Sequence, residues 1–103
     1  MEYDRDSGNI FLTDKDKELS GFVLSPISRE DAPTLFKRVD GKLNDAIDRI
    51  RDLSAEVPGT RKSDAHNQLR ARIADLAVLT EAIRPIAADV ELERMIDQGK
   101  FGS

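Results

Sequence analysis

The sequence lacks cysteine and tryptophan, and its aromatic residues are one tyrosine and four phenylalanines. Without cysteine, a disulfide framework, a zinc–thiolate site, an iron–sulfur cluster and thiol catalysis are all excluded. No apolar run approaches the roughly 20 residues that cross a bilayer, and the polar, acidic start has no apolar region typical of a signal peptide. We therefore expect a soluble protein, located in the cytoplasm or within a larger assembly such as a virion.

Catalytic motifs are also lacking. The chain has no glycine-rich phosphate loop, dinucleotide fingerprint or nucleophile elbow. Its one histidine, His66, has no carboxylate at the spacing of a metal-binding helix motif. Asp45, Asp48 and Asp52 share a predicted helix face, where we expect a solvated surface and pairing of Asp45 with Arg49. The sequence predicts no enzyme, no catalytic residue, no metal and no cofactor.

The opening stretch, Asp4-Arg5-Asp6-Ser7-Gly8-Asn9, resembles the start of a calcium loop but does not continue as one. Counted from Asp4, the fifth position is Gly8 where a ligand is needed, and the sixth is Asn9 where glycine is needed. The twelfth position, where a bidentate glutamate belongs, is Lys15. Because these residue types also favour tight turns, we predict a hairpin turn here.

Length and charge limit the fold and its partners. A chain of 103 residues is one domain that buries about two-thirds of its unfolded surface, which leaves little room for a deep pocket. Charged residues make up 35% of the chain, and the net charge of −4 disfavours general binding of nucleic acid. One stretch is locally basic, and it contains Arg61, Lys62, Arg70 and Arg72.

Residues 1–27 are predicted to form a small β-hairpin or meander, with strands at roughly 2–5, 10–13 and 21–25. The segments "NIFLT" and "GFVLS" are β-prone, and the polar residues 14–18 separate them. Because an isolated hairpin is marginally stable in water, this segment must pack on helices or on a partner.

Two helices are predicted next, over residues 29–57 and 63–98. In each, apolar residues alternate in steps of three and four, which indicates heptad packing. Ser28 or Asp31 can cap the first helix, and Pro85 is expected to kink the second. Since few residues separate the helices, the fold class is mainly α, an antiparallel αα-hairpin with heptad packing. The predicted seams contain Phe36, Val39, Leu43, Ala46, Ile50, Leu53 and Val57, and then Leu69, Ile73, Leu76, Thr80, Ile83, Ala87 and Val90.

The second helix has more apolar residues than one neighbouring helix can cover. Its additional large side chains are Val78, Leu79, Ile86, Leu92, Met95 and Ile96. If this set stayed exposed, several kcal/mol of favourable burial free energy would be lost, at about 25 cal/mol per Å² of apolar area. Two ways to cover the set are open, and both can apply together. The N-terminal strands can cover it through Ile10, Leu12, Phe22 and Leu24, and another chain can cover it from outside.

These observations favour a non-enzymatic subunit for protein–protein interaction or assembly, such as an adaptor or a chaperone-like or structural component. Its binding surface would be the broad apolar face of the second helix, with a protein partner or with a second copy in a four-helix bundle. The alternative is a small dimeric regulator that contacts RNA or DNA through the basic stretch. No membrane partner is expected.

Overall fold

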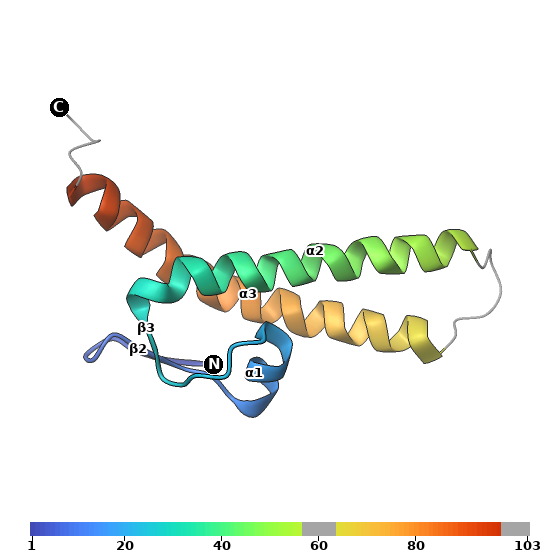
Figure 1. Ribbon diagram of the computed structural model, residues 1–103, viewed down its shortest axis with the longest axis horizontal. Coiled ribbons are helices and arrows are strands. Elements are labelled where there is room, and N and C mark those ends of the chain that lie inside the picture. Colours follow the sequence, from blue (N-terminus) through green and yellow to red (C-terminus); the bar gives the residue numbers. More distant parts are fainter. Residues whose placement is uncertain (57–63, 98–103) are drawn as a thin grey trace.

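The computed structural model describes residues 1–56 and 64–97, of which most are helical. A small antiparallel sheet and a short helix come first, and two long helices follow (Figure 1). The elements in chain order are β1 (Glu2–Asp4), β2 (Asn9–Phe11), α1 (Asp14–Ser20), β3 (Ile27–Ser28), the 3-10 turn η1 (Arg29–Asp31), α2 (Ala32–Glu56) and α3 (Asp64–Asp97).

The long helices α2 and α3 pack side by side, and their chain directions are opposed in Figure 1. Residues 1–28, the N-terminal layer, lie on one side of this pair and contact both helices through α1. The layer reaches only part of the way along the pair. The end of α2 and the start of α3 therefore extend beyond it as two helices without a third layer (Figure 1). We call this part, residues 42–56 and 64–73, the distal segment.

The sheet has the order β1-β2-β3, with both pairs antiparallel, which confirms the predicted small N-terminal sheet. Its first turn is held by Asp4, whose carboxylate accepts hydrogen bonds from the Ser7 hydroxyl at 2.9 Å and the Asp6 amide at 3.0 Å. These bonds, that from Ser7 first, lower the pKa of Asp4. Gly8 takes a positive φ of 74°, as the turn requires. The opening stretch is thus a hairpin turn, as predicted.

Residues 14–18, predicted to be a polar connection, instead belong to the helix α1, which runs to Ser20. Thr13 is its N-cap: the Thr13 hydroxyl accepts from the Asp16 amide, and the Asp16 carboxylate accepts from the Thr13 amide, both at 3.1 Å. Gly21 ends the helix in the left-handed conformation at φ 76°. This capping box and glycine stop turn a short charged stretch into a helix that buries Leu19.

The strand predicted at residues 21–25 is wrong, because this segment pairs with no strand. Gly21 must leave the extended conformation to cap α1, so the segment begins as a turn. The third strand comes later, where Ile27 pairs with Ile10 and Ser28 with Asn9. Val23 and Leu24 are exposed, so Leu24 does not cover the helices as expected.

Both long helices lie close to their predicted ranges. The Ser28 hydroxyl accepts from the Glu30 amide and caps η1, which leads directly into α2. Helix α3 contains Pro85, and in Figure 1 its C-terminal part leaves the line of the first part and projects past the start of α2. The connection between the helices and the predicted seam residue Val57 lie outside the described residues.

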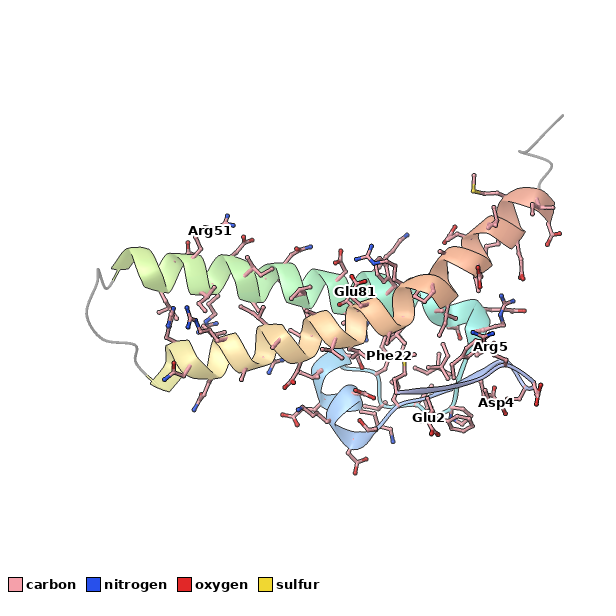
Figure 2. The ribbon with its side chains drawn as sticks, turned by 180° about the vertical axis from the view of Figure 1, so that it is seen from behind. Glu2, Asp4, Arg5, Phe22, Arg51 and Glu81 are labelled. Carbon is pink, nitrogen blue, oxygen red and sulfur yellow. The ribbon has the colours of Figure 1, made fainter. Side chains whose placement is uncertain are left out.

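The hydrophobic core lies where the N-terminal layer meets α2 and α3. It combines residues from all three parts, and Figure 2 shows Phe22 at their junction. Arg38 of α2 stacks 4.8 Å from the centre of the Phe22 ring, which further attaches the layer to the helices. The core comprises Ile10, Leu12, Leu19 and Ile27 of the layer, Ala32, Leu35, Val39 and Ala46 of α2, and Leu76, Leu79, Ile83, Ile86 and Ala87 of α3.

Candidate interaction surface

Helix α3 has two apolar faces, of which one is buried and one is exposed. The buried face points toward α2 and the N-terminal layer and includes Leu76, Leu79, Ile83, Ile86 and Val90. On the opposite side, positions spaced by four, three, four, three and four residues form one row of solvent-exposed residues. We call this row the outer stripe. It consists of Val78, Ala82, Pro85, Asp89, Leu92 and Ile96.

The outer stripe is apolar at every position except Asp89. Val78 is 72% exposed, Leu92 46% and Ile96 57%, and Met95 lies beside the last two and is also exposed. Scattered exposed apolar residues are ordinary on protein surfaces. Here, however, they follow one helix face from residue 78 to residue 96, a distance of about 27 Å at 1.5 Å per residue. This continuity makes the stripe a candidate binding surface.

Polar contacts on the neighbouring face of α3 fix the part of the helix that carries the last residues of the stripe. Beyond Val90, the final buried residue of α3, the Arg29 guanidinium donates two hydrogen bonds to the Glu93 carboxylate, at 2.8 and 3.1 Å. The bond from Arg29 lowers the pKa of Glu93. Arg94 donates to the backbone carbonyl of Glu30 at 2.9 Å. These contacts tie the C-terminal part of α3 to η1 and leave Leu92 and Ile96 facing solvent.

The middle of the stripe borders the edge strand β1. Ala82, Pro85 and Asp89 form one wall of a shallow cleft of about 500 Å³, and Tyr3 and Arg5 form part of the other. A partner that lies along α3 would therefore also contact the sheet edge at this point.

Of the six apolar residues that the sequence predicted for partner binding, four are exposed and two are buried. Val78, Leu92, Met95 and Ile96 are exposed. Leu79 is only 3% exposed and Ile86 only 7%, because the N-terminal layer packs on them within the same chain. In this conformation neither side chain is available to a partner, so the surface is narrower than the sequence suggested.

The basic residues of the alternative hypothesis are only partly described. Arg61 and Lys62 lie outside the described residues, whereas Arg70 and Arg72 are exposed near the start of α3. Arg72 lines a groove between α2 and α3 together with the acidic residues Asp45, Asp48 and Asp52 of α2. The groove therefore mixes both signs of charge.

The remaining candidate groups in the described part of the chain are His66 and the carboxylates. His66 is half-buried near the start of α3. Across residues 1–56 and 64–97, no three histidine or carboxylate side chains come together as metal ligands would. Within the same ranges, no helix is both long enough and apolar enough to cross a membrane.

Comparisons of the chain with protein-family models, with curated proteins and with solved structures gave no match.

Proposed function

We propose that this protein is a non-enzymatic interaction subunit that binds another protein along the outer stripe of α3. One observation carries the proposal: α3 has a second apolar row, on the side opposite its buried face. A helix that needs only its own fold usually has charged or polar residues on that side.

The shape of the stripe indicates what the partner presents. An apolar row on a helix is complementary to a helix or groove with its own apolar residues at intervals of three and four. Asp89 interrupts the row near its centre, so a lysine or arginine of the partner at that level would be favoured. The proposal includes heptad packing, both for this contact and for an antiparallel hairpin formed by α2 and α3.

Burial of the outer stripe would contribute favourably to binding. Covering Val78, Leu92 and Ile96 would remove three large side chains from water, each worth about 1.5–3 kcal/mol when fully buried. These residues are already partly covered and association carries its own cost, so the net gain is smaller. Met95 and the cleft beside β1 would add further contact area.

Site-specific photocrosslinking in native extract can test the proposal. A crosslinking amino acid at position 92 is expected to give one discrete product with a second protein, identifiable by mass spectrometry. The same amino acid at position 44, where Asn44 is exposed on α2, is the matched control. The product supports binding along the outer stripe if Ile96→Asp abolishes the product and leaves the circular dichroism melt unchanged. Equal labelling from both positions, or a product that survives Ile96→Asp, would contradict the proposal.

Nucleic-acid binding has less support, because the Arg72 side of the groove faces three aspartates. If that alternative holds, Arg70→Glu with Arg72→Glu should abolish a salt-dependent shift of RNA or DNA, whereas Ile96→Asp should leave it intact.

A further inference from the structure

The distal segment contains a groove that the N-terminal layer does not fill. It lies between α2 and α3, is open to solvent, and has a volume of about 850 Å³. Ala46, Leu53 and Leu69 provide its apolar lining. Leu53, Leu69 and the neighbouring Ile73 are only half-buried. Under the layer, by contrast, the seam residues Val39, Leu76 and Ile83 are fully buried. Toward this groove the layer reaches as far as Gly21, which lies close to the ammonium end of Lys42.

Four charged residues of α2 line this groove in a regular order. Lys42, Asp45, Arg49 and Asp52 are spaced by three, four and three residues, so they form one row along the helix, which we call the charge stripe. Their charges alternate in sign. The sequence predicted an ion pair between Asp45 and Arg49, but none of the four forms an ion pair with any described residue. The prediction of that pair is therefore wrong.

The alternation makes the charge stripe complementary to itself when one copy is reversed. If two α2 helices lie antiparallel with residue 47 level with residue 47 of the second copy, Lys42 faces Asp52 of the second copy and Asp45 faces Arg49 of the second copy. Two-fold symmetry then gives each of these pairs twice. A parallel arrangement in register would instead place each charge against the same charge. Asp48 lies level with the buried Ala46 of the second copy and gains no charged partner.

We propose that two copies of this chain associate through their distal segments, with the α2 helices antiparallel and the charge stripes paired. Surface ion pairs are individually weak. In this interface they select the direction and register of the contact, while the apolar lining of the groove supplies its affinity. The occupant of the groove is thus a second copy.

The N-terminal layer is compatible with this arrangement. The charge stripe runs from residue 42 to residue 52, ten steps of 1.5 Å, or about 15 Å of helix. It begins beside Gly21, as far as the layer reaches toward the groove. In an antiparallel pair the two layers lie at opposite ends of the contact, so neither occupies the space of the other. The outer stripe of α3 is not required, and this dimer stands independently of the proposed function.

Charge reversal with complementation tests both the contact and its register. Asp45→Arg places two arginines opposite each other, and Arg49→Asp places two aspartates opposite each other. Each variant alone should weaken the dimer at least tenfold in sedimentation equilibrium at low salt. An equimolar mixture of the two should restore association to within about threefold of the unmodified protein, since every facing pair is then opposite in charge. The double variant should also dimerise.

Two controls separate this contact from other effects. Arg51→Asp makes the same charge change on α2, at a side chain that Figure 2 shows projecting away from α3, and it should leave the dimer unchanged. Ile96→Asp should likewise leave it unchanged. The proposal is overturned if the unmodified protein is monomeric up to on the order of 1 mM. It is also overturned if the single variants dimerise normally, or if mixing them gives no recovery. Loss of the dimer in Ile96→Asp alone would place self-association on α3 instead.

Discussion

Helices α2 and α3 pack against each other but differ in what they present to solvent. The apolar residues of α2 gather on one face, and its outer surface is charged. Those of α3 lie on two opposite faces, one in the core and one along the outer stripe. Beside the N-terminal layer, the one apolar face of α2 is covered by α3 and the layer, whereas the second face of α3 remains available. The two helices are thus suited to different contacts, directed by charge on α2 and by apolar area on α3.

The largest effect on stability is expected when two adjacent residues of α3, one buried and one exposed, are compared. Leu79→Asp places a carboxylate in the core and should lower the free energy of unfolding by several kcal/mol. This is most of the stability of a small domain, so the variant should be largely unfolded at room temperature and show no cooperative thermal transition. Val78→Asp, one residue earlier on the outer stripe, should change the free energy of unfolding by no more than about 0.5 kcal/mol. Circular dichroism melts measure both. If the two variants unfold alike, α3 does not have the two faces described here.

A smaller effect is expected from the single buried face of α2. Leu35→Ala removes a fully buried side chain and should cost about 2–5 kcal/mol in urea unfolding. Asn44→Ala, on the exposed side of the same helix, should be within about 0.5 kcal/mol of the unmodified protein. A cost for Leu35→Ala below about 1 kcal/mol would show that α2 is not packed as described.

The N-terminal layer, which packs on the buried face of α3, can be destabilised locally at the start of α1. Thr13→Ala removes the N-cap hydroxyl of α1 and should lower the free energy of unfolding by about 1 kcal/mol. The matched control is Thr34→Ala, an exposed threonine of α2 that caps no helix, which should be neutral or slightly stabilising. Equal effects of the two variants would argue against the capping box.

The smallest effect concerns the tie between α3 and η1. The folded-state pKa of Glu93 is lowered, so the stability it contributes is present above its ordinary pKa and is lost as the pH falls through the lowered value. Arg29→Ala should therefore raise the pKa of Glu93 toward its ordinary value of 4.5, as followed by NMR titration. An unchanged Glu93 pKa would mean that this tie is absent in solution.

The sequence predicted the parts of the fold that depend on local pattern. Steps of three and four residues placed α2 and α3, and Asp4 with Gly8 placed the first turn. It missed α1, although Thr13, Asp16 and Gly21 are the residues that start and stop that helix. The apolar run at residues 21–25 was misleading, because Val23 and Leu24 lie exposed in an irregular segment. Patterns of hydrophobicity do not show which runs find a strand to pair with.

The sequence predicted only part of the interaction surface, again because a hydrophobic pattern does not report contacts between distant residues. Val78 and Leu79 are neighbours with similar chemistry, and only the position of the N-terminal layer decides which one is covered. That position depends on contacts between residues far apart in the chain, which periodicity does not report. The charge stripe, by contrast, is readable from the order of Lys42, Asp45, Arg49 and Asp52. The sequence predicted only the pair of Asp45 with Arg49 within one helix, because residue spacing reports neighbours along a helix and not contacts between two chains.

The core joins Ile10 and Ile27 to Ile83 and Ile86, so it brings together segments separated by more than fifty positions in the sequence. During translation, the N-terminal layer leaves the ribosome long before α3 exists to receive it. The layer cannot reach its final packing until residue 86 has emerged, since its apolar side faces that helix. Acquisition of the native state must therefore wait for nearly the whole polypeptide, and the early segment stays unprotected in the meantime.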